Sequence, residues 1–411
     1  SDLSFRWSEA INLPDVADAY TYAMYFNKMQ LNDGKTAVQF DDTRLQAIKD
    51  YASGTITTTT QPNRNTPTIW DWIGNTNTDW YDVVFGGTAF SQEHSLSVSG
   101  GTEKIQYYFS GNYMGQEGMM AIRRDKLQRY SVSSKINAQL YPWLNMNYSM
   151  KYMRKDYSKP TAMTDNTLYQ NIAKRWPMEP TVDPNGYPMG NTIIRPILYG
   201  GDNNSQTDWL YQQFQVVIEP IKDWKIFGEI NYKVIDAFTH TDYLKVPQMN
   251  VAGEPYSGDT WKTSKVTEGA ERTNYFNANV YSEYYRSFAD AHHLKAMVGF
   301  QAEVNKWRQL QASKLDLISE SVPSINAATG ESTIDKSKLT HWATAGFFGR
   351  LNYDYKERYL LEVNLRYDGT SRFAKDKRWN LFPSFSAGWN VAREAFMEPT
   401  NHIINTLKIR G

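Results

Sequence analysis

The stretch SVSSKINAQLYPWLNMNYSMKYMRKDY, residues 131–157, alternates polar and apolar side chains for most of its length. Successive side chains of a β-strand point to opposite faces, so this alternation predicts a hairpin with one apolar and one polar face. The predicted apolar face carries Val132, Ile136, Ala138 and Leu140 before the turn at 141–143, then Leu144, Met146, Tyr148, Met150 and Tyr152. That face covers a protein core or contacts lipid.

The composition of the 411 residues excludes several classes of protein. The net charge is zero, without the basic excess of nucleic-acid-binding proteins, so no nucleic-acid partner is expected. Cysteine is absent, which excludes a disulfide scaffold, a zinc ribbon and a cysteine nucleophile. Mean hydropathy is −0.62, and no run approaches the roughly 18 apolar residues of a membrane helix. A helical membrane span is therefore excluded.

Alternating segments recur in pairs from residue 94 to the end, with connections of two very different lengths. Short polar turns join the two members of each pair, at residues 101–104, 141–143, 221–223, 289–292 and 356–358. The predicted connections between pairs are long, at roughly 115–127, 156–207, 236–271, 306–341 and 369–379. Compact domains rarely place several long loops at one end of a sheet, whereas membrane β-barrels have short periplasmic turns and long outer loops.

One predicted strand shows how a membrane barrel would use its two faces. Its apolar row is Tyr359, Leu361, Val363, Leu365 and Tyr367. Its polar row is Glu362, Asn364, Arg366 and Asp368. A charge pointing into lipid costs a few kcal/mol, so the polar row suits a lumen and the apolar row a lipid contact. The pattern predicts an all-β, transmembrane antiparallel barrel.

Residues 1–93 differ from the rest of the chain. The alternation at 2–9 predicts a first strand, and the spacing over 14–34 predicts a helix with Pro14 in its first turn and Gly34 beyond its end. The Thr-rich segment 55–68 is expected to be flexible. We interpret 1–93 as the first barrel strand and a long extracellular loop with short helices, and 94–411 as barrel hairpins.

Several segments resemble the barrel of SusC-like TonB-dependent transporters of Bacteroidetes outer membranes. The most specific is ERYLLEVNLRYDGTSRFAKDKRWNLFPSFSAGWNVAREAFM, residues 357–397. SLSVSGGTEKIQYYFSGNYMGQEGMM (95–120), RYSVSSKINAQLYPWLNMNYSM (129–150) and TDWYDVVF (78–85) are similar too. LPDVADAYTYAMYFNKMQLNDG, residues 13–34, is similar to the first extracellular loop of that family.

The resemblance implies an outer-membrane importer with a plugged barrel of about 22 strands. The segments here account for about thirteen, so we expect a partial barrel without the plug domain and the C-terminal strands. A sheet with open edges is not tolerated in lipid, which indicates a piece of a larger transporter. The resemblance also implies energy from TonB–ExbB–ExbD, a SusD-like lipoprotein lid, oligosaccharide or oligopeptide cargo, and no cofactor.

No residue pattern indicates catalysis or a metal, so we expect that the protein is not an enzyme. The six histidines are scattered, at His94, His240, His292, His293, His341 and His402. The run GDNNSQTD could offer calcium ligands from Asp202, Asn203, Asn204 and Asp208, but it lacks the EF-hand Gly and Glu, which favours a solvated loop. Glu268 and Glu271 could in principle serve a glycosidase, without any supporting pattern.

Aromatic residues in the long loops are the candidate substrate contacts. Flat rings beside Asn, Asp and Arg suit recognition of sugars or peptides, because apolar faces stack and polar groups fix orientation. The candidates are Trp70, Trp72, Trp80, Tyr81, Trp176, Tyr187, Tyr199 and Trp261. Packing of the loops against one another, or against a partner, is the alternative reading for most of them.

The alternative function is a soluble, secreted glycan-binding β-sandwich, in which the apolar faces form a core. Strand length separates the two readings, because membrane strands need about 9 to 11 residues while ordinary strands have about 5 to 6. The alternating segments here are long, which favours the barrel. Sequence does not identify the cargo.

Overall fold

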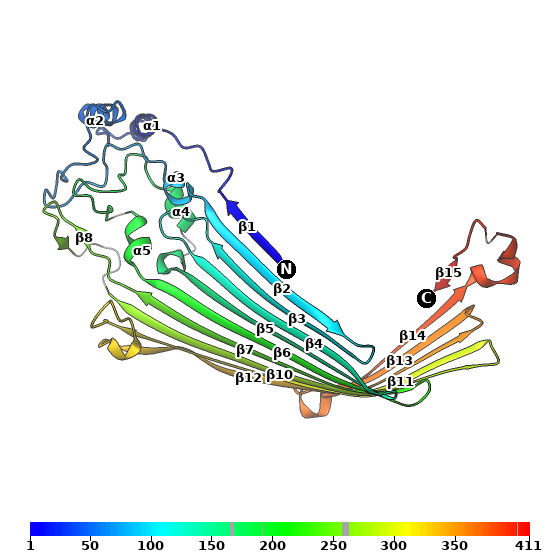
Figure 1. The fold of residues 1–411 in the computed structure, drawn as a ribbon. Helices are drawn as coiled ribbons and strands as arrows, with labels where there is room; N and C mark the ends of the chain where they lie inside the picture. Colours follow the sequence, from blue (N-terminus) through cyan, green and yellow to red (C-terminus); the bar gives the residue numbers. More distant parts are fainter. Residues whose placement is uncertain (165–167, 191, 257–262, 401) are drawn as a thin grey trace.

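Thirteen strands form one antiparallel meander. The computed structural model describes residues 1–164, 168–190, 192–256, 263–400 and 402–411. The strand order follows the chain, β1-β2-β3-β4-β5-β6-β7-β10-β11-β12-β13-β14-β15. Figure 1 shows this sheet twisted and curled into an open trough with most helices gathered at one end. The prediction of an all-β, partial antiparallel barrel of about thirteen strands is confirmed.

The elements have the following bounds. The sheet contains β1 (Asp2–Ser8), β2 (Ala89–Gly101), β3 (Ile105–Glu117), β4 (Lys126–Tyr141), β5 (Leu144–Pro160), β6 (Asp202–Ile221), β7 (Trp224–Tyr243), β10 (Lys265–Phe288), β11 (His292–Leu315), β12 (Ser332–Tyr355), β13 (Tyr359–Thr370), β14 (Trp379–Asn390) and β15 (Lys408–Arg410). A separate pair is β8 (Gln248–Met249) and β9 (Pro255–Tyr256). The α-helices are α1 (Ala19–Asn32), α2 (Asp42–Ala52), α3 (Trp80–Phe85), α4 (Leu168–Ala173) and α5 (Ile194–Tyr199).

The register keeps polar side chains beside polar ones across the sheet. Asn147 of β5 lies opposite Gln215 of β6, and Gln215 lies opposite Glu229 of β7. On the next rung, Tyr148 lies opposite Phe214, and Phe214 opposite Ile230. Alternate rungs face opposite sides, so the sheet has one polar face and one apolar face.

The apolar face is not covered by other parts of the described chain. Val132 keeps 48% of its surface exposed, Trp7 67% and Phe385 71%. A β-sandwich would bury such a face against a second sheet, but among the described residues the only other sheet is the two-stranded β8–β9. The sandwich alternative is therefore wrong.

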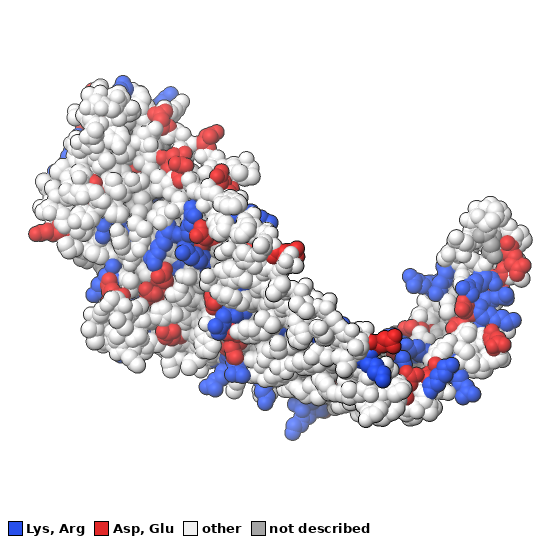
Figure 2. Space-filling view, viewed as in Figure 1, with Lys and Arg blue, Asp and Glu red and all other residues white. Residues whose placement is uncertain are grey.

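A row of charged residues ends the apolar face on the side of the long connections. Arg154, Asp208, Asp236 and Arg272 occupy one rung across β5, β6, β7 and β10. Arg154 and Asp208 approach to 2.9 Å, and Arg272 and Asp236 to 3.5 Å. We call these four residues the outer charged row. Figure 2 shows charge concentrated near the two ends of the sheet, with largely uncharged surface between.

Several strands are longer than the alternation predicts. β10, β11 and β12 each have 24 residues, so the connections between strands shorten to 244–264 and 316–331. The predicted connections 236–271 and 306–341 are therefore too long. The outer parts of these strands are polar on both faces, for example at Glu268 and Glu271. Main-chain hydrogen bonds and side-chain pairs with the neighbouring strands keep them extended.

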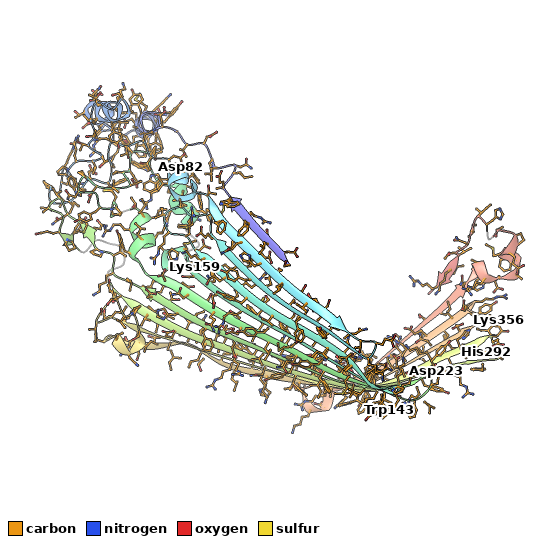
Figure 3. All side chains as sticks on the ribbon, viewed as in Figure 1. Asp82, Trp143, Lys159, Asp223, His292 and Lys356 are labelled. Atoms are coloured by element: carbon orange, nitrogen blue, oxygen red, sulfur yellow. The ribbon has the colours of Figure 1, made fainter. Side chains whose placement is uncertain are left out.

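The turns between paired strands are tight, as predicted, and two of them contain two consecutive non-glycine residues with positive φ. Lys356 and Glu357 have φ of 52° and 53°, and Ala289 and Asp290 have φ of 51° and 48°. This is the left-handed conformation that a type I′ turn requires at both central positions. Figure 3 shows Trp143, Asp223, His292 and Lys356 together at this turn end, and Asp82 and Lys159 at the opposite end. The last strand, β15, has three residues.

The first helix begins later than predicted. Pro14 lies outside α1, which starts at Ala19, because the Asp18 carboxylate accepts a hydrogen bond from the Thr21 main-chain N–H and acts as the N-cap. The Thr-rich segment is packed at one point, since Thr60 is fully buried and donates its hydroxyl to the carbonyl of Asp71. Within the described ranges no helix has the length and apolarity needed to cross a membrane.

Candidate functional site

Three long connections at one end of the sheet pack into a layer. We call it the loop layer and define it as the described residues of 9–88, 161–201 and 244–264. The Gly74 main-chain N–H donates to the carbonyl of Met178 at 3.1 Å, which joins the first connection to the second. The Leu244 N–H donates to the carbonyl of Gly200 at 3.1 Å, which joins the second to the third. The three connections therefore form one body.

Side-chain hydrogen bonds fix α1 and α2 at the outer surface of this layer (Figure 1). The Asp41 carboxylate caps α2 by accepting from the Arg44 main-chain N–H at 2.9 Å. Asn27 of α1 binds both main-chain groups of Phe40, donating to its carbonyl at 2.6 Å and accepting from its N–H at 3.0 Å. The segment between the helices is thus held against α1.

Trp176 stands at the centre of an aromatic cluster under α1. Its ring centroid lies 4.7 Å from Phe26, 4.9 Å from Trp72, 5.6 Å from Tyr22 and 5.8 Å from Phe40. Tilted contacts between aromatic rings stabilise the fold beyond what the burial of their surface contributes. Trp176 therefore joins the first two connections, which supports the packing reading for this residue.

Trp80 also lies in a core. It is 3% exposed, and it packs with Val84, Met120, Ile172 and Ile197. Its indole Nε1 donates to the carbonyl of Trp176 at 3.1 Å. Trp80 and Trp176 are therefore structural residues of the loop layer.

The remaining candidates are more accessible. Trp72, Tyr187 and Tyr199 are 37%, 41% and 49% exposed. Trp70 and Tyr81 are half-buried, Trp70 in a β-bridge with Pro62 and Tyr81 against the Trp80 core. Trp261 lies outside the described residues. The candidates thus divide between two packed clusters and a few exposed rings.

Three charged groups of the second connection are buried. Glu179 is 3% exposed, and desolvation raises the pKa of its carboxyl although Arg175 lies 3.0 Å away. Desolvation also raises the pKa of Asp183 and lowers that of Arg195. Arg195 donates to the carbonyls of Pro188 and Pro247, which ties the connection to its neighbour.

A groove of about 710 Å³ opens between α1 and α2. Its apolar walls are Met24, Tyr25, Leu31, Val38, Phe40 and Leu45. Lys28, Asp41 and Asp42 add charge at its margins. We call it the helix groove. Two of its walls are accessible, since Met24 is 44% exposed and Leu31 is 56% exposed.

The possible metal and catalytic groups are used within the structure. Asp202 and Asp208 lie on strand β6 rather than in a solvated loop, and they pair with Arg123 and Arg154. Glu268 bonds His240 at 2.7 Å. Glu271 bonds Gln309. In the described part of the chain no three His, Cys, Asp or Glu residues gather to hold a metal ion.

The polar face carries an amide network that sequence reasoning missed. Glu229 accepts hydrogen bonds from Gln213 at 3.1 Å, Asn231 at 2.7 Å and Gln215 at 3.3 Å. Asn147 bonds Gln215 at 2.9 Å and extends the network to β5. The alternation predicted polar residues here, but only the register shows which of them meet across strands.

Known proteins resemble this chain in sequence and in fold. The TonB-dependent receptor SusC of Bacteroides thetaiotaomicron is 27% identical over 369 residues, covering 82% of this chain and 34% of SusC. The TonB-dependent receptor P39 of Formosa agariphila is 25% identical over 329 residues, covering 77% of this chain and 30% of P39. The chain thus spans about a third of the length of these relatives.

The fold has a solved counterpart. The structure of the RagAB peptide transporter superimposes with a TM-score of 0.76 at 18% identity, over 96% of this chain and 45% of the RagAB chain. Residues 151–408, more than half of the 411 residues, match the family described as TonB dependent receptor-like, beta-barrel. With its thirteen-stranded two-faced sheet, the chain belongs to this family of TonB-dependent receptor barrels.

Proposed function

We propose that this chain supplies barrel wall and extracellular loops to an outer-membrane importer of oligosaccharides or oligopeptides. The observation that carries the proposal is the sheet, whose uncovered apolar face suits lipid and whose polar face suits a lumen. Membership of the TonB-dependent receptor family supports it. No catalytic step is part of this function.

The proposed orientation follows from the two ends of the sheet. Short turns face the periplasm, and the loop layer faces outward, as in other membrane barrels. Residues 1–93 then form the first strand and a long extracellular loop, and residues 94–411 form barrel hairpins. Energy enters from the periplasm when TonB–ExbB–ExbD acts on a plug in the barrel of the complete transporter and opens a path for cargo.

A SusD-like surface lipoprotein is the proposed partner, closing over the loop layer as a lid. The helix groove is the proposed contact, because it lies at the outer surface and its exposed apolar side chains suit burial against another protein. The relatives SusC and RagAB support pairing with such a partner. Trp72, Tyr187 and Tyr199 remain the proposed ring contacts for cargo beneath the lid, because they are exposed.

Uptake by cells that produce the complete transporter tests this function. Labelled oligosaccharide and oligopeptide mixtures are offered to wild-type cells, to cells lacking the transporter gene and to cells lacking TonB. We expect saturable uptake of one mixture that disappears in both mutants and returns on complementation. Uptake that persists without the transporter, or without TonB, would contradict the proposal.

A further inference from the structure

Lysine and tyrosine alternate across four strands on the polar face below the loop layer. The register places Lys151 of β5 opposite Tyr211 of β6, Tyr211 opposite Lys233 of β7, and Lys233 opposite Tyr275 of β10. These four strands are neighbours in the sheet (Figure 1). We call the four residues the Lys–Tyr row. They line a concavity of about 590 Å³ that also includes Ser149, Gln213 and Asn231.

The two ammonium groups of the row have no carboxylate partner among the described residues. The nearby carboxylates are engaged elsewhere. Glu229 is held by the amides of the network described above. Glu303 accepts from the Tyr275 hydroxyl at 2.5 Å and from the Thr344 hydroxyl at 2.7 Å. Hydrogen bonds from neutral groups leave the charges of Glu229 and Glu303 in place, but neither carboxylate lies within ion-pair distance of Lys151 or Lys233. Both ammonium groups are therefore free to pair with a bound anion.

The tyrosines of the row present defined ring surfaces. The bond to Glu303 fixes the orientation of Tyr275, and the Lys233 Nζ lies 5.2 Å from the centre of the Tyr275 ring. Asn277 lies two residues further along β10 on the same face and is 5% exposed, so the surface beside Tyr275 is well packed. Tyr211, between the two lysines, is 43% exposed. The Lys233 ammonium thus has the face of the Tyr275 ring beside it, and Lys151 lies opposite Tyr211 in the register.

The position of the Lys–Tyr row along the strands places it where cargo would pass in the proposed importer. Lys151 directly precedes Tyr152 of the apolar face, and it is three residues before Arg154 of the outer charged row. The row is therefore level with the outer edge of the apolar face and looks toward the space beneath the loop layer. In the proposed importer this is inner wall between the lid and the membrane interior.

We propose that the Lys–Tyr row binds acidic rings of an anionic oligosaccharide; this inference rests on the proposed import function and names its cargo class. Carboxylate or sulfate groups on the sugar pair with the ammoniums of Lys151 and Lys233. Apolar sugar faces stack on Tyr211 and Tyr275. The hydroxyl and amide side chains around the row bind sugar hydroxyls. An acidic peptide without aromatic residues, such as tetraglutamate, supplies the charge but no apolar ring face.

The test is calorimetric binding to the full-length transporter in detergent. The probes are tetragalacturonate, its methyl ester and tetraglutamate, and the variants are K151Q/K233Q and Y211A. The control is K295Q, which removes one positive charge from the polar face at Lys295, an ammonium paired with Glu283 at 3.1 Å. We expect tetragalacturonate to bind at least about tenfold more tightly than its ester, with K151Q/K233Q removing that difference.

The remaining measurements distinguish a failure of this cargo proposal from a failure of the proposed import function. Y211A is expected to weaken both the acid and the ester, K295Q to change neither, and added salt to weaken the acid alone. Equal binding of acid and ester, tighter binding of tetraglutamate, or an equal loss in K295Q would overturn the inference while leaving TonB-dependent uptake intact. Absence of binding together with absence of TonB-dependent uptake would overturn the proposed function as well.

Discussion

Trp80 and Trp176 are joined by a hydrogen bond, in which the indole Nε1 of Trp80 donates to the main-chain carbonyl oxygen of Trp176 at 3.1 Å. The two residues belong to different connections and to the two largest cores of the loop layer. This contact explains why two rings that look like substrate contacts in the sequence are structural in the fold.

Replacing Trp176 with alanine should loosen the loop layer without unfolding the sheet. The ring contacts four aromatic neighbours, and its loss should cost about 3 kcal/mol, near the lower end for such changes, because the ring is only half-buried. Limited proteolysis of the full-length protein should show faster cleavage within 9–88. W72A, which removes a more exposed ring of the same cluster, should have a smaller effect.

The loop layer should be more stable in mildly acidic solution. Burial raises the pKa of Glu179 above its ordinary value of 4.5, so the folded layer binds that proton more tightly than the unfolded one. The favourable contribution is complete below the ordinary value and is lost as pH rises through the raised value. Hydrogen exchange of residues 176–183, corrected for intrinsic rates, should be slower at pH 5 than at pH 7.

E179Q supplies the decisive comparison for this pH effect. It should reduce the dependence of layer stability on pH, leaving the part due to Asp183, whose pKa burial also raises. E254Q, at an exposed position of the same layer, should leave the dependence unchanged. An unaltered profile in E179Q would assign the effect to another group.

Adjacent residues on opposite faces of β4 should respond differently to a new charge. V132R places a guanidinium on the apolar face and should cost about 2 to 4 kcal/mol of folding free energy in a bilayer if the site lies near the midplane. S133R places it on the polar face and should cost much less. Folding yield of the full-length protein into lipid vesicles measures both, and similar losses would argue against lipid contact on the apolar face.

The helix groove should govern capture of the proposed lid. L31D introduces a charge at an exposed apolar wall of the groove, and it should weaken co-purification of the lipoprotein at least about tenfold, as a contact worth 1.4 kcal/mol or more would. M29D is the control, because Met29 is 55% exposed on the same helix but does not line the groove. Equal retention of the lipoprotein by L31D and wild type would exclude the groove as the contact.

The sequence predicts the sheet well because the alternation of Val132 and Ile136 with polar neighbours reflects a physical difference between its faces. It underestimates β10 and β11, whose outer parts are polar on both faces and are held by partners on neighbouring strands. Side-chain periodicity does not register such partners.

The candidate site was less predictable for the same reason. Whether Trp176 or Tyr199 is exposed depends on contacts between connections far apart in the chain, and the pairing of Lys233 with Tyr275 depends on register. The start of the first helix was also mispredicted. Pro14 suits a first helical turn, but Asp18 caps the helix four residues later and sets its start. Residue type alone identified candidates without deciding their roles.

The 24-residue strands have a mechanical consequence. Such a strand rises about 80 Å along its axis, whereas an apolar band about 25 Å tall crossed at a tilt of about 45° takes up only about 35 Å of it. About half of the excess, seven residues of each strand, lies beyond the rung of the outer charged row, where it extends the barrel wall. In the proposed importer this extension holds the mouth clear of the membrane surface, so a bulky glycan and the proposed lid can meet there without competing with lipid headgroups for space.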